Sequence, residues 1–348
     1  MLIPSTHSSA LSLLVVALVC LGSWANTLKL TGNRWRFEFF YLDFSVGALL
    51  VAALAGFTLG SSGNELGIGD RALVAGRMAQ VWAIAGGVVF NIGNLLLTAA
   101  VSLVGMSAAF PLSVGIALIV TSVTSFRSSN LLLLALGIAC CLSAVFLQVR
   151  ACLQQHPAGV VPKSANLRSR AAPRPIDQRR MRTIKGLIAG IFGGIFLGFF
   201  YQLAATGING EFGLGPYAGG VLFATGILGS SIAFLFIFVN VAIEGPPLRF
   251  SSYFRGTFRQ HLLGWGGGAI WTGGMLSALL ANAAPPEIGL GNPVRIGLPA
   301  ASALLYVIWG LVFWREFSKA SVGAKSSLAL GAALLAGAIM LVAIGVAA

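Results

Sequence analysis

Long apolar stretches, separated by short polar ones, run along almost the whole chain. A helix needs about 20 apolar residues to cross a bilayer whose hydrocarbon core is about 30 Å thick. Ten stretches have this length, with ends defined to within several residues: 9–28, 42–60, 78–103, 107–126, 130–149, 184–206, 216–243, 260–282, 293–314 and 326–347. The pattern predicts an all-α polytopic membrane protein with ten transmembrane helices.

One long polar segment divides these stretches into two groups of five. Residues 150–185 are rich in Arg, Pro, Ser and Gln and have no apolar periodicity, which is typical of a linker. We expect residues 1–149 to form the first five-helix half, 150–183 a basic linker and 184–348 the second half. Because five is an odd number, two similar halves would be inverted relative to each other, giving a 5+5 inverted repeat.

A faint internal repeat supports two similar halves. Residues 86–94 and 267–275 both read Gly-Gly, two apolar residues, an aromatic residue, a small polar residue and, two positions after it, a Gly. Each is followed by a stretch that contains proline. The alternative is that Gly-rich helices resemble one another by chance. If the repeat is real, these two glycine-rich helices and the proline-containing helices after them are suited to line a cavity at the midplane of the membrane. Breaks in a helix are tolerated there, because protein or water satisfies the freed backbone groups.

Composition agrees with a lipid environment. Hydrophobic residue types make up 57% of the chain and charged types 9%, whereas soluble domains carry about 25% charged residues. The net charge of +13 would also suit a nucleic-acid partner. The basic residues lie between apolar stretches, however, where membrane proteins carry them, so we expect no binding to nucleic acid.

The basic residues also predict an orientation. When successive loops are assigned to alternate sides, one side receives all but four of the 22 Lys and Arg residues, the exceptions being Arg71, Arg77, Arg127 and Arg295. The positive-inside rule then places the linker in the cytoplasm and both termini outside a plasma membrane, which we expect to be a bacterial inner membrane. Residues 1–10 carry no Lys or Arg, so we interpret the first stretch as a retained span and not as a signal peptide.

Enzymatic and metal-binding patterns are not evident in the sequence. The cysteines are Cys20, Cys140, Cys141 and Cys152, without a C-x-x-C pair or a nearby histidine cluster, and we interpret them as buried thiols. The histidines are His7, His156 and His261, and the sequence gives none of them a partner at catalytic spacing. Neither H-E-x-x-H nor G-x-S-x-G occurs. We therefore expect no enzyme, no catalytic residue, no metal and no cofactor.

Polar side chains at bilayer depth are costly and are candidates for function. Asn91 and Asn94 are three residues apart and share one helical face. Their amides can both donate and accept hydrogen bonds, which suits hydroxyl-rich or ureido solutes. Trp271 and Thr272 hold the equivalent positions in the second half, where Trp271 would stack on a sugar or a planar ring. The alternatives are helix–helix hydrogen bonds, worth about 0.6 kcal/mol each, and ordinary packing.

Further candidates lie in the first span of each half. Tyr201 and Gln202 fall late in the stretch at 184–206, and Trp24 and Asn26 fall near the end of the stretch at 9–28. We expect these four side chains to contact the solute together with the midspan residues. Lys29 is better interpreted as a basic anchor that extends to the membrane surface.

Proton coupling requires a titrating group within the pathway. Asp43 is the first candidate, because it enters the second apolar stretch, and Glu38 is the second. An interfacial ion pair of Asp43 with Arg34 or Arg36 is an equally good interpretation. No carboxylate lies at midspan, so facilitated diffusion without an ion stays open.

Several sequence runs resemble a known family. They are 86–96, 104–107, 111–118 and 309–317, with 22–29, 36–38 and 41–43 in the first hairpin. In this order, over nearly the whole chain, they resemble the drug/metabolite transporter superfamily, in the branch of ureide permeases, rhamnose–proton symporters and glucose-uptake permeases. The resemblance implies ten helices in a 5+5 inverted repeat, alternating access and uptake of a small polar solute, often with a proton.

One departure concerns the linker. Plant ureide permeases carry a phosphate-loop-like motif in a long central loop, whereas residues 159–164 of this chain have neither the spacing nor the glycine that such a loop needs, so we expect no ATP binding. A small-molecule solute and the lipid bilayer are the expected partners, and a homodimer is left open. The function predicted is secondary transport of a sugar, ureide or related metabolite, by symport in the uptake direction. An exporter of drugs or metabolites on the same fold is the alternative.

Overall fold

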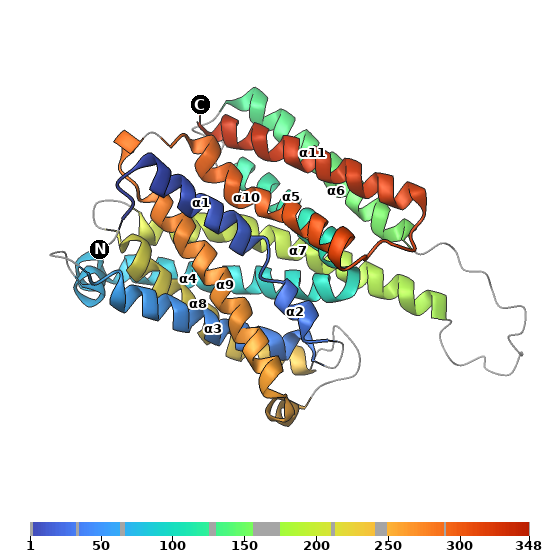
Figure 1. Ribbon diagram of the computed structural model, residues 1–348, viewed down its shortest axis with the longest axis horizontal. Helices are drawn as coiled ribbons and strands as arrows, with labels where there is room; N and C mark the ends of the chain where they lie inside the picture. Colours follow the sequence, from blue (N-terminus) through green and yellow to red (C-terminus); the bar gives the residue numbers. More distant parts are fainter. Residues whose placement is uncertain are drawn as a thin grey trace, which may run out of the picture.

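The computed structural model describes residues 3–32, 35–62, 67–124, 130–155, 175–209, 213–240, 249–288 and 290–347, and no strand occurs within these ranges (Figure 1). The helices are α1 (His7–Leu21), α2 (Asn26–Leu30), α3 (Phe37–Thr58), α4 (Ile68–Val104), α5 (Met106–Thr124), α6 (Leu131–Gln154), α7 (Pro175–Ile208), α8 (Gly215–Asn240), α9 (Phe258–Asn282), α10 (Asn292–Ile308) and α11 (Val322–Ala347), with short helical turns η2 (Phe250–Arg255), η3 (Pro286–Ile288) and η4 (Trp309–Phe313).

Nine helical segments of the described chain are long and apolar enough to cross a membrane. The first combines α1 and α2, and the others are α3 to α8, α10 and α11. The chain is therefore a polytopic, all-helical membrane protein, as predicted. The stretch at 260–282 forms the 25-residue helix α9 but is not among the nine. It is rich in glycine and contacts α1, α2, α3, α8 and α10, so much of its surface faces protein.

The first predicted span is not one continuous helix. Helix α1 ends at Leu21, and α2 begins at Asn26 after a short turn. The hydroxyl of Tyr306 on α10 bridges this break, since it donates to the carbonyl of Leu21 at 2.7 Å and accepts from the amide of Ala25 at 3.4 Å. A helix break at membrane depth needs such partners for its freed backbone groups. The span predicted at 9–28 is therefore present, with a break that the apolar pattern did not indicate.

Two other helices are longer than predicted. Helix α4 begins at Ile68, but Gly76 inside it has non-helical angles (φ 76°, ψ 168°), so the straight part agrees with the predicted start near residue 78. Helix α7 begins at Pro175, within the segment expected to be a linker, and its first turns extend beyond the bundle (Figure 1). The phosphate-loop comparison at 159–164 lies outside the described residues.

Helices α4 and α8 approach each other closely at glycines. A Cβ atom on Gly87 would overlap the carbonyl oxygen of Phe223, and a Cβ on Gly226 would overlap that of Ile84. Each helix therefore places a glycine against the backbone of the other. Only a residue without a side chain permits this contact, which is how membrane helices pack when no hydrophobic force draws them together.

Helices α3 and α9 meet in the same way. A Cβ on Gly268 would overlap the carbonyl oxygen of Phe44, and a Cβ on Gly47 would overlap that of Trp265. On each of these four helices, the glycine lies three residues from the residue whose carbonyl the partner glycine contacts. The two contacts hold α4 against α8 and α9 against α3 at backbone distance.

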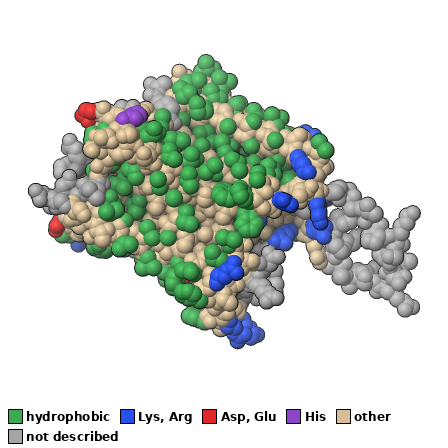
Figure 2. All heavy atoms as spheres, in the orientation of Figure 1, with side chains coloured by type: hydrophobic (Ala, Val, Ile, Leu, Met, Phe, Trp, Pro, Cys, Tyr) green, Lys and Arg blue, Asp and Glu red, His purple; other side chains and the backbone are tan. Residues whose placement is uncertain are grey.

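Charge is distributed unequally between the two ends of the bundle. Figure 2 shows Lys and Arg side chains gathered where α7 begins and near η2, while Asp and Glu appear at the opposite end. We call the end of the bundle with the Lys and Arg side chains the basic end. It carries the start of α7, the turn after α10, and helix α2 (Figure 1).

We predict that alanine at Gly87 or at Gly268 destabilises the folded protein by about 1–3 kcal/mol, because the new methyl group forces two backbones apart. Gly266 is the matched control, since it lies on the same helix as Gly268 and a Cβ added there would meet no atom within 4 Å. Alanine favours helices by up to about 1 kcal/mol over glycine, so Gly266→Ala should be neutral or stabilising. Thermal unfolding of purified protein in detergent measures this. Equal effects at Gly266 and Gly268 would contradict the packing described.

Candidate functional site

A cavity of about 580 Å³ opens at the end of the bundle opposite the basic end. We call it the vestibule. Its lining comes from the ends of α7 and α9 and the starts of α8 and α10, and the polar members are Tyr201, Asn209, Asn282 and Arg295. Ligand cavities in proteins usually measure about 300–1,000 Å³, so the vestibule is large enough to admit a small organic molecule.

The vestibule reaches deep into the bundle. Phe200 lines it and lies nine residues before Asn209, also a lining residue, on a helix with a rise of 1.5 Å per residue. This corresponds to a depth of about 13 Å, close to half of a hydrocarbon core of about 30 Å. The deeper lining residues are Phe200 and Phe223.

Aromatic side chains continue from that depth toward the basic end. Phe223 and Phe200 contact Phe90, with ring centroids 5.5 and 5.1 Å apart, and Phe90 stacks on Trp271 at 4.5 Å. Trp271 is 5% exposed. Since Trp271 lies near the centre of α9, it forms part of a closed aromatic floor beneath the vestibule.

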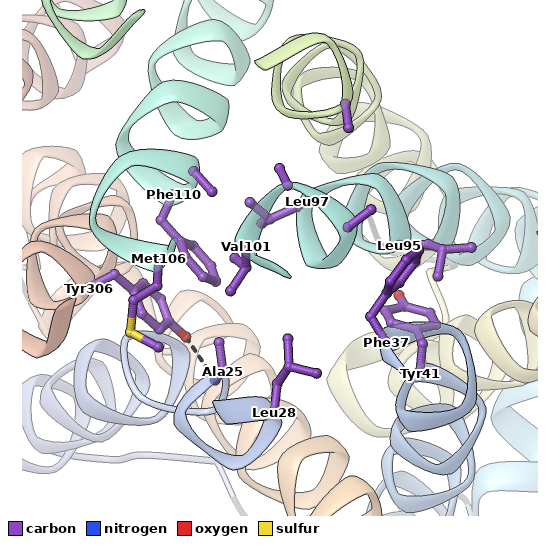
Figure 3. Close-up of a cluster of buried hydrophobic side chains, with 14 of the residues drawn as sticks. Ala25, Leu28, Phe37, Tyr41, Leu95, Leu97, Val101, Met106, Phe110 and Tyr306 are labelled. Atoms are coloured by element: carbon purple, nitrogen blue, oxygen red, sulfur yellow. Dashed lines mark hydrogen bonds between the residues drawn. The ribbon is translucent and has the colours of Figure 1, made fainter. Parts of the chain in front are cut away.

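A second group of rings continues the row. Phe44 is 5.8 Å from Trp271 and 4.9 Å from Trp24, and Trp24 is 5.9 Å from Phe110. Phe110 stacks on Tyr306 at 3.4 Å, at the break between α1 and α2 (Figure 3). We call the row from Phe200 to Tyr306 the aromatic chain. Its buried rings separate the vestibule from the basic end.

Asn91 is fully buried in a polar network between helices. Its Nδ2 donates to Ser230 at 2.7 Å, and its Oδ1 accepts from Ser231 at 3.1 Å. Ser231 also contacts the hydroxyl of Ser45 at 2.6 Å. The amide thus links α4 to α8, and through Ser45 to α3. This is the helix–helix role that the sequence left open as an alternative.

Asn94 differs from Asn91 in having an unused donor. It is 2% exposed, and its Nδ2 has no hydrogen-bond partner. The hydroxyl of Tyr41 also lacks a hydrogen bond of normal geometry among the described residues, although Asn94 lies close enough to interact with it. The Tyr41 ring lies beside Phe37 and Leu95 on the face between α3 and α4 (Figure 3). Burying a polar group without a partner costs about 1–3 kcal/mol, so a solute that pairs with these groups would recover that energy.

The remaining predicted contact residues lie in several places. Thr272 is buried and donates to the carbonyl of Ala48 on α3 at 3.3 Å. Tyr201 lines the vestibule. Gln202 lines a different groove, beside Trp82 and Phe199, and donates to Thr124. The structure thus brings Trp24, Trp271 and Tyr201 to the vestibule and the aromatic chain and separates Gln202 from them.

Asn26 lies at the start of α2, toward the basic end. Its Nδ2 donates to the carbonyl of Ser23, and its Oδ1 accepts from the indole of Trp314 at 2.7 Å. Both ends of the amide are therefore engaged in holding the turn between α1 and α2.

Asp43 lies in a compact cluster with two residues that the sequence did not connect to it. The carboxylate is fully buried, and His261 Nδ1 lies 3.0 Å from both of its oxygens. The hydroxyl of Tyr253 donates to Oδ1 at 2.5 Å. We call Asp43, Tyr253 and His261 the carboxylate cluster. Burial, and then the adjacent carboxylate, raise the pKa of Tyr253, so its hydroxyl stays protonated and serves as a donor.

This cluster bears on two interpretations from the sequence. Arg36 pairs with Glu38, whereas the hydrogen-bond partners found for Asp43 are Tyr253 and His261. Arg34 lies outside the described residues, so its pairing with Asp43 stays untested. His261 has a partner after all, although 218 positions separate it from Asp43 along the chain. No local spacing could have indicated this pair, because it depends on the packing of α9 against α3.

A second buried carboxylate closes the basic end. Glu316 forms an ion pair with Lys29 at 2.7 Å and accepts from the backbone amides of Met106 and Ser107, each at 2.9 Å, and from the Ser107 hydroxyl at 2.6 Å. Met106 begins α5, so its amide lacks a partner within the helix, and the helix dipole favours an anion there. We call this arrangement the Glu316 latch. It joins α2 and α5 to the segment after α10, and it gives Lys29 a role other than a free surface anchor.

Comparisons with known proteins give partial matches. Ureide permease 4 of Arabidopsis thaliana is 29% identical over 158 residues, covering 42% of this chain and 39% of that protein. Ureide permease 2 of the same plant is 30% identical over the same length. A probable ureide permease A3 of Vigna unguiculata is 30% identical over 153 residues, covering 41% of this chain and 40% of its own. The matches thus span about two fifths of each relative.

The fold has a counterpart over its full length. A solved structure, described only as a crystal structure of a protein, aligns with a TM-score of 0.50 at 16% identity, covering 96% of this chain and 97% of its own. This likeness concerns the fold alone. No family model matches the sequence. The chain is therefore a multi-pass helical membrane protein that is similar over part of its length to proteins named ureide permeases.

Proposed function

We propose that this protein is a secondary transporter that takes up a small polar organic solute, such as a ureide, a sugar or a related metabolite, by alternating access. The observation that carries the proposal is the vestibule, which reaches about half-way through the bundle and ends on the closed aromatic chain. A pathway open at one end and closed at the other is what one state of such a transporter requires. The similarity to proteins named ureide permeases supports the same class of function.

The solute site is proposed where the vestibule meets the aromatic chain. Trp271 would stack on a planar or sugar ring once the floor opens. Asn94 and Tyr41 would supply hydrogen bonds, since both have unused polar atoms. Tyr201 would contact the solute on entry, and Asn91, Thr272, Trp24, Asn26 and Gln202 would act mainly by fixing the helices that carry the site.

We propose ten spans, with α9 as the tenth, in two inverted halves. The helix contacts support two inverted halves. A repeat pairs each of the first five spans with one of the last five, so every contact in the bundle should have a counterpart between the paired helices. Four contacts have such counterparts: α4–α7 corresponds to α1–α9, α3–α9 to α4–α8, α5–α7 to α1–α10, and α5–α6 to α10–α11. The glycine contacts exchange too, since Gly87 against Phe223 corresponds to Gly268 against Phe44. The basic end would face the cytoplasm, with both termini and the vestibule outside.

Proton coupling is proposed for the carboxylate cluster. Asp43 is buried, while the His261 side chain is 18% exposed and so gives the cluster a route to water. Histidine is the side chain that most readily changes charge near neutral pH. Glu38, the other carboxylate considered, is held by a guanidinium that stays charged, which favours Asp43 over Glu38 as the proton carrier.

Export on the same fold is the alternative. Neither Asn91 nor Asn94 lines the vestibule in this state, and a fold does not determine the direction of transport. Uptake into proteoliposomes with an imposed pH gradient of either sign distinguishes the two directions.

We predict that a thermal-shift screen of the purified protein against sugars, ureides and nucleobases identifies the solute class. A ligand at 100 times its Kd stabilises the folded state by about 2.7 kcal/mol. Asn94→Ala should then raise the KM for that solute about tenfold with little change in Tm, since the Asn94 Nδ2 makes no hydrogen bond of normal geometry among the described residues. Asn91→Ala should lower the Tm, because it breaks two interhelical hydrogen bonds. An unchanged KM for Asn94→Ala would remove this residue from the site.

We predict that Asp43→Asn abolishes accumulation driven by a pH gradient while solute exchange across the membrane continues. Exchange needs no net movement of protons, so it separates the coupling step from solute binding. Glu38→Gln is the comparison variant and should still accumulate solute. Accumulation by Asp43→Asn at the level of the unmodified protein would rule out the carboxylate cluster as the coupling site.

We predict that Lys29→Met loosens the Glu316 latch and favours the state open to the cytoplasm. Cys152 is 1% exposed and lies near Glu316, so it can report the opening. In a protein with the other three cysteines replaced, maleimide should modify Cys152 several times faster when Lys29 is replaced. Lys325→Met, at an exposed lysine of the same end, is the control. Equal rates for both variants would show that the latch does not hold this end closed.

A further inference from the structure

One arginine in the vestibule has no counterion among the described residues. Arg295 is the charged residue among the described lining residues, which include no Asp or Glu. It forms no ion pair within the described chain, and its Nε is buried without a hydrogen-bond partner. Charges held partly out of water are normally paired, so an arginine in this state is suited to bind an anion that enters the vestibule.

The local backbone adds to the positive potential. Arg295 lies in the first turn of α10, where its amide bonds to the carbonyl of Gly291. Helix N-termini carry a partial positive charge, and a cation there is unfavourable unless an anion is close. Helix α8 also begins at the vestibule, at Gly215 and Pro216. Two helix starts and a guanidinium therefore face the same cavity.

The remaining lining limits the shape of the ligand. Asn209 and Asn282 offer amide groups that both donate and accept hydrogen bonds. The flat rings of Phe200 and Phe223 lie at the deep end. A guanidinium binds a carboxylate through two parallel hydrogen bonds, and the amides of Asn209 and Asn282 suit an amide or ureido group on the same small ligand.

We propose that the transported solute is a small carboxylate with a planar amide or ureido body, and that Arg295 binds its carboxylate in the vestibule. This rests on the proposed transport function and narrows its substrate class from polar solutes in general to anionic ones. It also gives the carboxylate cluster a reason to carry protons, because an anion entering a negatively charged cell needs an accompanying positive charge.

The test uses two ligands that differ only in charge. N-carbamoylglycine carries a carboxylate at neutral pH, and N-carbamoylglycinamide is its neutral isostere. Binding of both is measured by calorimetry and thermal shift on the full-length purified protein, unmodified and as Arg295→Gln, Arg295→Lys and Arg77→Gln. Arg77 is an exposed arginine on α4 that does not line the vestibule, so its variant controls for overall surface charge.

We expect the unmodified protein to bind the carboxylate at least about tenfold more tightly than the amide, in line with a charge-assisted hydrogen-bond pair. Arg295→Gln should remove this preference by weakening only the carboxylate. Arg295→Lys should keep part of it, because lysine retains the charge without the planar fork. Arg77→Gln should keep all of it.

Three results would overturn the proposal: equal binding of the two ligands by the unmodified protein, binding of neither, or a preference that persists in Arg295→Gln. Uptake assays separate this failure from failure of the proposed function. If neutral sugars or ureides are transported while carboxylates are ignored, only the anion inference is wrong. If no solute of any class enters proteoliposomes, the transport proposal itself fails.

Discussion

Backbone contact at four glycines is the constraint on which the rest of this structure depends. Gly87 and Gly226 hold α4 against α8, and Gly47 and Gly268 hold α3 against α9. In lipid there is little hydrophobic force between helices, so close backbone approach supplies much of the packing energy. The same contacts determine how the large rings on these helices stack, since Phe90, Phe223, Phe44 and Trp271 lie within a turn of those glycines. Small residues and large rings at adjacent positions thus give a tight bundle with one row of aromatic side chains through its centre.

The two ends of that row are built differently. At the vestibule the helices diverge, and polar side chains reach water. At the basic end, the Tyr306 hydroxyl satisfies the break between α1 and α2, and Glu316 closes the start of α5. Both devices use side chains from the last third of the chain to satisfy backbone groups of the first third. The basic end is therefore closed by hydrogen bonds and one ion pair between segments that are distant in the sequence. Such contacts can break while the glycine contacts between α4 and α8 and between α3 and α9 stay in place.

The sequence predicted the helices well and the site only in part. Length and hydropathy located each span-length helix of the described chain, because a bilayer demands about 20 apolar residues whatever the tertiary structure. The break after Leu21 was missed because the residue that stabilises it, Tyr306, lies on another helix. The Asp43–His261 pair was missed for the same reason. Asn91 and Asn94 could not be distinguished from the sequence, since they share a helical face. Their neighbours on other helices make the difference: both ends of the Asn91 amide are hydrogen-bonded, whereas the Nδ2 donor of Asn94 is not.

Helices α3 and α9 carry both the Asp43–His261 pair of the carboxylate cluster and the Phe44–Trp271 contact of the aromatic chain. Asp43 precedes Phe44 on α3, and His261 lies less than three turns before Trp271 on α9. Gly264 of α9 packs directly against the Cβ of Asp43. A rocking of α9 against α3 would therefore change the distance between His261 and the carboxylate and, in the same movement, the contact of Trp271 with Phe44. Protonation that weakens the first contact would bias the second. Coupling of proton binding to solute binding would then need no relay of side chains between the two sites. The single interface between α3 and α9, which both sites share, would be enough.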